Sequence, residues 1–233
     1  CIASGRHRFM IEHLHDLIEL ADYYISSNGA VLTDRHMNVI SGDLIPFETT
    51  KIITEHLDRM HIDYVVYSLK NVFFRENGDL IQTKFHKQID LLKSLNLNTS
   101  TAIEDSIENL RHLAIEKIVL YKALKEEIKL IDEMIMKMAI DIDIQKTGDS
   151  FHSILNRNGS KGSRVYKLMD LLKIDATSII VFGDYYNDIS MFKVAGHRIA
   201  PSNAVDTIKK LATHITFSNN DDGVSKFIDE FII

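Results

Sequence analysis

The chain is organised around residues 179–192, which read IIVFGDYYNDISMF. Four apolar residues run up to Gly183, as they do in the buried strands of a parallel sheet. Asp184, Asn187 and Asp188 follow in the turn before the next helix. Open α/β sheets bind their ligands beyond the carboxyl ends of the strands. The stretch therefore predicts an α/β fold with a binding site at this strand-to-helix turn.

Two carboxylates in one short turn repel each other unless a cation neutralises them. Oxygen ligands that leave part of the coordination open suit Mg²⁺, which keeps waters and often binds phosphate at the same time. We therefore predict Asp184 and Asp188 as ligands of Mg²⁺. The alternative is that Asp188 only caps the helix, but a cap needs one acidic residue rather than a cluster after a glycine.

The composition is that of an ordinary globular protein. The 233 residues are 45% hydrophobic and 26% charged, which suffices for one large domain or two small ones. The net charge of −6 and the lack of a basic stripe argue against nucleic acid as a partner. No apolar run reaches the roughly 18 residues that span a bilayer, so we expect no membrane partner. A single cysteine excludes an internal disulfide and fits a reducing compartment, so the expected location is cytoplasmic.

Residues 183–191, GDYYNDISM, resemble the fourth motif of the haloacid dehalogenase-like phosphatases. The resemblance is closest to their Cof-type branch, which hydrolyses small phosphorylated metabolites. Other motifs of that branch occur in the same order along nearly the whole chain. Residues 2–6 (IASGR) resemble the second motif, residues 27–30 (SNGA) a loop near the site, residues 159–162 (GSKG) the third motif, and residues 219–224 (NNDDGV) a closing loop.

The residues of these motifs are the candidate site. A small hydroxyl followed by glycine at Ser4-Gly5 suits a phosphate-binding turn, although a helix cap at Ser4 is an equal reading. Lys161 opens an apolar-striped helix, where the dipole disfavours a cation. Taken alone it would be read as a surface lysine, but the order of the motifs favours a lysine that reaches toward an anion. By resemblance, Ser4, Gly5 and Lys161 would bind the phosphoryl group. The expected catalytic set is Ser4, Lys161 and Asp184. The resemblance adds two further candidates for substrate binding, Asn28 and Asn187.

The middle of the chain differs from its ends. Residues 44–156 contain glycine only at positions 78 and 148 and carry many charged helical segments. This block lies between the second and third motifs, where the branch inserts its large cap domain. We therefore expect a discontinuous core domain of residues 1–43 and 157–233, with a doubly wound, Rossmann-like sheet. Residues 44–156 would be the inserted α+β cap.

Hydrophobic periodicity predicts the individual elements. The expected helices span residues 6–20, 48–60, 85–95, 101–112 and 123–138. The expected strands span residues 22–26, 31–32, 39–40, 64–69, 72–74, 117–121 and 139–144, with a turn at 76–79. From residue 160 onward, strands and helices are expected to alternate.

The nucleophile motif of the family, Asp-x-Asp, should precede the region of Ser4, but this sequence has no such motif there. The chain begins at Cys1 rather than methionine, and Ile2-Ala3 resembles the end of a strand whose beginning is missing. We expect the nucleophilic aspartate and one core strand to lie upstream of Cys1, so that the chain as shown is inactive. The alternative is a displaced pair, Asp141 and Asp143, but solvent-facing positions on a cap strand explain them better.

The resemblance thus implies a Mg²⁺-dependent phosphohydrolase of small phosphorylated metabolites, such as sugar phosphates, that works through an aspartyl-phosphate. Two alternatives remain open from the residues. The chain could be a non-catalytic relative that binds a phosphorylated ligand or a protein, or Cys1 could be an N-terminal nucleophile of an amidase. The sequence gives no indication of the oligomeric state.

Overall fold

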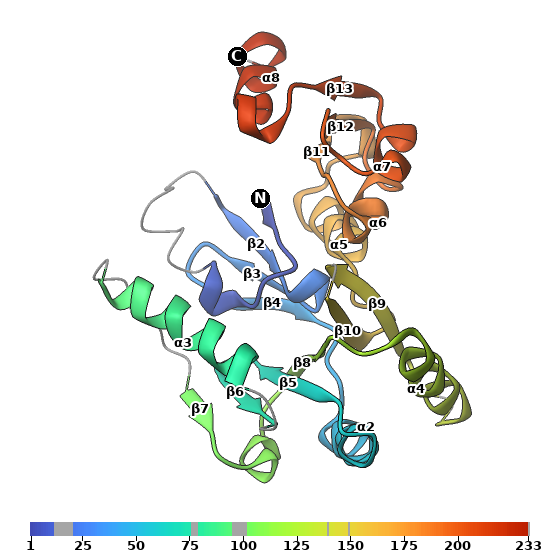
Figure 1. Ribbon diagram of the computed structural model, residues 1–233. Coiled ribbons are helices and arrows are strands. Elements are labelled where there is room, and N and C mark those ends of the chain that lie inside the picture. The colour runs from blue at the N-terminus through green and yellow to red at the C-terminus, as the bar shows by residue number, and fades with distance from the viewer. Residues whose placement is uncertain (12–20, 76–78, 95–101, 139, 149, 233) are drawn as a thin grey trace. The chain divides into compact units, whose positions relative to one another are not determined.

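The computed structural model describes residues 1–11, 21–75, 79–94, 102–138, 140–148 and 150–232. These residues fall into two units, Cys1–Gly159 and Ser160–Ile233 (Figure 1). Most of the helix expected over residues 6–20 and of the turn expected at 76–79 lies outside the described residues. None of the described helices is both long and apolar enough to cross a bilayer.

The first unit begins with a small four-stranded sheet in the order β1-β2-β3-β4. β1 pairs with β2 in parallel, and the other two pairings are antiparallel. The predicted hairpin between β3 and β4 is confirmed, and the Asp34 carboxylate closes its turn by accepting the backbone N–H groups of His36 and Asn38. The elements are β1 (Ile2–Ala3), the short helix η1 (Arg8–Met10), β2 (Tyr23–Ser26), η2 (Ser27–Gly29), β3 (Val31–Asp34) and β4 (Val39–Gly42).

A larger sheet of six described strands follows, in the order β7-β6-β5-β8-β10-β9. Neighbouring strands are antiparallel except for β6 and β7, which are parallel. The strands are β5 (Asp63–Ser68), β6 (Asn71–Phe74), β7 (Ala102–Glu104), β8 (Ile115–Tyr121), β9 (Ile142–Gly148) and β10 (Phe151–Asn156). The helices of this part are α2 (Phe47–Arg59), α3 (Asp79–Ser94), η3 (Ile107–Leu110) and α4 (Lys125–Met138).

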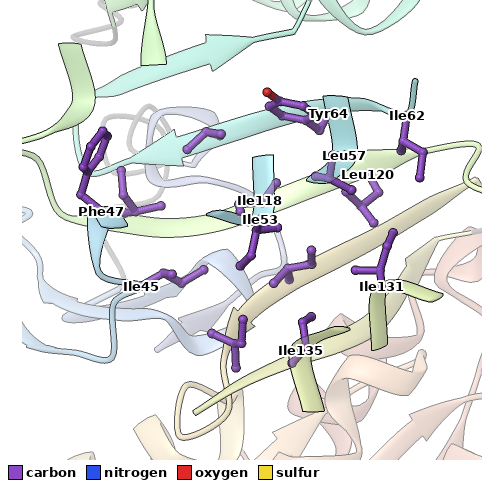
Figure 2. Packing of buried hydrophobic residues seen from close by; sticks show 14 of the residues in the cluster. Ile45, Phe47, Ile53, Leu57, Ile62, Tyr64, Ile118, Leu120, Ile131 and Ile135 are labelled. Atoms are coloured by element: carbon purple, nitrogen blue, oxygen red, sulfur yellow. The ribbon is translucent and has the colours of Figure 1, made fainter. Parts of the chain in front are cut away.

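A hydrophobic cluster covers each face of the six-stranded sheet. Successive side chains of a strand point to opposite faces, so one strand contributes to both clusters. On β5, Tyr64 and Val66 belong to the cluster that packs with α2 and α4, which contribute Ile53 and Ile131 among others (Figure 2). Val65 and Tyr67 of the same strand belong to a second cluster with Phe85 and Ile89 of α3. The second cluster also contains Phe9 of η1, so the segment after β1 packs against this sheet.

The helix predicted over residues 101–112 is wrong. Its first part is the strand β7, which adds to the sheet by pairing Ala102 and Ile103 with β6. Its second part is only the single turn η3, whose backbone N–H at Glu108 is capped by Ser106 Oγ. Pairing with a strand distant in sequence overrides the local helical pattern here. β10 was not predicted.

The second unit has the predicted alternation of strands and helices. Its three strands form a parallel sheet in the order β11-β12-β13. The strands are β11 (Ile180–Phe182), β12 (His197–Pro201) and β13 (His214–Thr216). The helices are α5 (Lys161–Leu172), η4 (Ala176–Ser178), η5 (Tyr186–Asp188), α6 (Ile189–Phe192), α7 (Asp206–Leu211), η6 (Asn219–Asp221) and α8 (Gly223–Phe231). This arrangement confirms the α/β fold class.

Candidate active site

Ser4 lies directly after β1 and begins a tight turn. Its backbone N–H donates to Ile25 O at 2.8 Å, which continues the pairing with β2. Its Oγ accepts the backbone N–H of Arg6 at 3.1 Å, a short side-chain-to-backbone turn. The cap of the next helix, η1, is His7 and not Ser4. A hydroxyl that accepts one N–H still has its own hydrogen to donate, so Ser4 can bind an anion.

The loop Ser27–Gly29 packs against this turn. Its three residues have φ angles of 50°, 61° and 101°, a left-handed run that is uncommon outside glycine and asparagine. The backbone N–H of Asn28 donates to Ser4 O at 3.1 Å, and that of Ser27 donates to Arg6 O at 2.8 Å. The structure thus brings the predicted residues Ser4 and Asn28 together, with Asn28 buried.

In the second unit, Lys161 and Asp188 form a buried ion pair. Lys161 Nζ lies 2.6 Å from Asp188 Oδ1, and the two side chains are only 6% and 5% exposed. Ser160 caps α5 through a reciprocal pair of hydrogen bonds with Ser163, which places Lys161 in the first helical turn. The helix dipole disfavours a cation at this position. Asp188 is the anion that offsets it.

Asp188 also holds the turn after β11 in place. Its Oδ2 accepts the backbone N–H groups of Asp184 at 2.9 Å and Tyr185 at 3.2 Å. Gly183 is required here, because a Cβ atom on it would lie 2.7 Å from Asp188 Cβ. Gly162 has an equivalent role, since its Cβ would lie 2.3 Å from Ser190 O. The two glycines of the motifs therefore allow α5, the turn and α6 to approach closely.

The Asp184 side chain is exposed, while its backbone is fixed by Val205 N–H, which donates to Asp184 O at 3.0 Å. Asn187 lies in η5, between the two carboxylates in sequence, and is half-buried. Among the described residues, no group of three or more His, Cys, Asp or Glu side chains is placed to hold a metal ion. One or two protein carboxylates, with waters and phosphate completing the shell, is the usual set for Mg²⁺. Asp184 offers an exposed carboxylate for such a set, and Asp188 a second, buried one whose oxygens already accept hydrogen bonds from Lys161 and from the turn.

The predicted site residues therefore fall into two groups, one in each unit. Ser4, Gly5 and Asn28 come together in the first unit. Lys161, Asp188 and the backbone of Asp184 come together in the second, with Asn187 beside them in η5. Ser4 and Gly5 follow the carboxyl end of β1, and Asn28 follows that of β2. Asp184, Asn187 and Asp188 follow the carboxyl end of β11, as the sequence predicts, whereas Lys161 opens α5.

A second charged cluster in the first unit was not predicted. Glu116 and Lys117 of β8 are 0% and 5% exposed. Glu116 Oε2 accepts the Ser27 hydroxyl, and Glu116 Oε1 lies 3.5 Å from His7 Nε2. Lys117 Nζ donates to Gly5 O at 2.7 Å. A Glu-Lys pair inside an otherwise apolar strand is the signal in the sequence that could have identified the cluster.

The environment shifts the pKa of both groups. Burial lowers the pKa of Lys117 to about 8, against a smaller opposite effect of Glu116. Burial raises the pKa of Glu116, but His7, Ser27 and Lys117 together outweigh it and hold that pKa below its usual value. Both shifts reflect charges that face protein rather than water.

The alternative carboxylate pair lies at the edge of the six-stranded sheet. Asp141 immediately precedes β9 and is exposed, whereas Asp143 lies within β9 and is half-buried. Ile142 between them is buried. This alternation is that of a half-exposed strand, as the sequence suggests.

Comparison with known proteins identifies the family. Residues 1–228 match the haloacid dehalogenase-like hydrolase family. The chain is 30% identical to the 5-amino-6-(5-phospho-D-ribitylamino)uracil phosphatase YwtE of Bacillus subtilis, over 99% of this chain and 85% of that protein. It is 25% identical to the pyridoxal phosphate phosphatase YbhA of Escherichia coli, over 100% and 85% of the two chains.

The fold agrees with this assignment. A haloacid dehalogenase-like hydrolase from B. subtilis superposes with a TM-score of 0.82 at 20% identity, over 99% of this chain and 86% of that one. This likeness extends the agreement from the motifs to the whole chain. The protein belongs to the haloacid dehalogenase-like hydrolase family.

Proposed function

We propose that this protein is a Mg²⁺-dependent phosphohydrolase that acts on small phosphorylated metabolites, such as sugar phosphates, through an aspartyl-phosphate. The observation that carries the proposal is the buried Lys161–Asp188 pair next to the exposed Asp184 carboxylate, at the carboxyl end of β11. A lysine and two carboxylates at such a position suit a site that takes phosphate together with a cation. The names of both relatives, phosphatases of small phosphate esters, support the same class of substrate.

The proposed domain organisation follows from which residues build each sheet. All strands of the six-stranded sheet, and helices α2, α3 and α4, come from within residues 44–156. This block has its own hydrophobic cluster between the sheet and α2 and α4. We assign it as the cap, which would exclude water from the first step and read the leaving group. Residues 1–43 and 157–233 would form the core.

In the proposed reaction, the carboxylate of a nucleophilic aspartate attacks the phosphorus atom. A bond from its carboxylate oxygen to phosphorus forms as the ester P–O bond breaks, and the leaving oxygen takes up a proton. A water then attacks the aspartyl-phosphate and returns the carboxylate and inorganic phosphate. The Ser4 hydroxyl would donate to a phosphoryl oxygen, since its Oγ already accepts the Arg6 N–H. Asn187 and Asn28 would add contacts to the substrate.

Lys161 would neutralise charge on the phosphoryl group. Its ammonium has three N–H groups, one of which donates to Asp188 Oδ1. Because Asp188 holds it in place, Lys161 can bind a phosphoryl oxygen without a large loss of side-chain entropy. Asp184 and Asp188 would hold Mg²⁺, which when bound offsets the charge between phosphate and the attacking carboxylate.

The test is phosphate release from a panel of monoesters by the complete gene product. The panel includes sugar phosphates and pyridoxal phosphate, each with Mg²⁺ or with excess chelator. We expect Mg²⁺-dependent release from at least one member. If the complete product binds phosphate esters, as measured by calorimetry, but releases no phosphate from any of them, the non-catalytic alternative is correct.

A further inference from the structure

A β-bulge in β8 presents two charged residues to the turn that contains Ser4. In the antiparallel pairing of β8 with β5, Lys117 lies opposite Tyr67 and Ile115 lies opposite Ser68. Glu116 is therefore an extra residue without a partner on β5. Bulges redirect side chains and are over-represented next to active sites. Here the bulge allows both Glu116 and Lys117, neighbours in sequence, to reach the N-terminal segment of the chain.

The contacts of the two residues converge on the peptide groups on either side of Arg6. Lys117 Nζ donates to Gly5 O at 2.7 Å. The N–H of the same Gly5–Arg6 peptide group donates to Ser4 Oγ at 3.1 Å. A trans peptide group is planar, with its C=O and N–H at opposite edges, so fixing the carbonyl fixes the direction of the N–H. Lys117 thus orients the group that holds the Ser4 hydroxyl.

Glu116 acts on the next peptide group. Arg6 O accepts the backbone N–H of Ser27 at 2.8 Å, and the Ser27 hydroxyl donates to Glu116 Oε2. His7 joins the same arrangement, with Nε2 at 2.6 Å from Ser68 O and 3.5 Å from Glu116 Oε1. Ser27 and His7 are buried along with Glu116. The turn of residues 4–7 is therefore attached to β8 on both sides of Arg6.

Stability alone does not explain this cluster, because burying charged groups costs free energy. A buried ammonium that binds a neutral carbonyl and faces an aromatic ring, here Tyr67 at 5.1 Å, forgoes most of its hydration. Apolar residues of similar volume often replace buried charges without loss of stability. The charges are better explained by the geometry that they impose on the turn.

We propose that Glu116 and Lys117 are positioning residues of the phosphate-binding turn, which fix the peptide groups flanking Arg6 and thereby aim the Ser4 hydroxyl. The inference rests on the proposed function, in which Ser4 binds the phosphoryl group and β8 belongs to the cap. The cap then contributes to catalysis beyond covering the substrate, because one of its strands sets the conformation of a core loop. Loss of the Lys117 cation should reduce kcat more than it raises KM.

The test compares Lys117→Met with the matched control Lys122→Met. Lys122 follows β8 directly, and its Nζ lies 5.1 Å from the Tyr121 ring, the same distance as Lys117 from Tyr67. Its backbone N–H donates to Ser150 O at 2.8 Å, between β9 and β10 rather than in residues 4–7. Amide hydrogen exchange at Arg6 and Ser27 is measured in the complete gene product. We expect Lys117→Met to accelerate exchange at both amides by about tenfold or more, and Lys122→Met to leave it unchanged.

Two additional measurements separate positioning from folding. Lys117→Arg keeps the cation and should restore slow exchange and most of kcat, whereas a merely packed side chain would gain nothing from the charge. Phosphate release by the same variants distinguishes the two proposals. If the wild-type protein hydrolyses no monoester, the proposed function fails while the exchange comparison still decides the role of Lys117. If the wild type is active and both methionine variants match it in exchange and kcat, the positioning role is wrong and the proposed function stands.

Discussion

The Lys161 ammonium lies 2.6 Å from the Asp188 carboxylate, in the first turn of α5, and both side chains are almost completely buried. The same carboxylate accepts two backbone N–H groups from the turn after β11. One side chain therefore links the helix, the turn and the exposed Asp184. The rigidity of the candidate site in the second unit depends on this pair.

Breaking the pair should cost stability. Lys161→Met leaves a buried carboxylate without its cation, and we expect a loss of about 3 kcal/mol in the free energy of unfolding. Lys209→Met is the control, because its ion pair with Asp206 at 3.0 Å is exposed and should contribute little. Urea unfolding of both variants measures the difference. If Lys161→Met and Lys209→Met have the same free energy of unfolding, the buried pair does not stabilise the fold as described.

Gly183→Ala should disturb the turn itself. The new Cβ would lie 2.7 Å from Asp188 Cβ and 2.8 Å from Phe192 Cε2, so either backbone or side chains must move. Overpacking of this kind typically costs about 1–3 kcal/mol, and here it should also displace Asp188 and lower activity. Gly42→Ala is the matched control, since its Cβ would have no contact shorter than 3.4 Å. The idea fails if both alanine variants unfold at the same urea concentration.

The buried Lys117 predicts a particular dependence of stability on pH. Burial lowers its pKa from 10.5, the ordinary value for a lysine in an unfolded chain, to about 8 in the folded protein. Between these values the unfolded chain binds more protons, so the stability contributed at this position rises with pH. The slope should approach about 1.4 kcal/mol per pH unit within that window.

The measurement is the free energy of unfolding of wild type minus that of Lys117→Met, from pH 7 to pH 10.5. We expect this difference to shift in favour of the wild type as pH rises through 8. Wild type minus Lys122→Met provides the reference for a lysine-to-methionine change outside the cluster. A difference for Lys117→Met that does not change with pH would mean that the ammonium is not held in a desolvated site.

Much of the second unit could be predicted from sequence because its signals are local. Apolar runs that end at glycine, such as the one before Gly183, predicted strands, and Lys161 at a helix start predicted a nearby anion. The structure supplies that anion as Asp188. The need for Gly162 could not be predicted, because it depends on the approach of α6 to α5.

The predictions made from the sequence are wrong or incomplete where segments far apart in the chain contact each other. Residues 102–104 became a strand by pairing with β6, a contact that the local pattern of residues 101–112 does not contain. The Lys117 contact with Gly5 joins residues 112 positions apart. The Glu116-Lys117 pair in an otherwise apolar strand indicates a buried charge cluster, but nothing near it in the sequence identifies Gly5 as the partner of Lys117. Such contacts follow from the tertiary fold rather than from periodicity.

In the proposed mechanism, Asp184 serves phosphate-ester hydrolysis rather than folding. The most direct measurement compares Mg²⁺-dependent phosphate release by Asp184→Asn and Asp206→Asn in the complete gene product, two isosteric changes at exposed carboxylates of the same unit. We predict that Asp184→Asn lowers kcat/KM by about 100-fold or more with an unchanged melting temperature, while Asp206→Asn retains wild-type activity. Wild-type activity in Asp184→Asn would contradict the account.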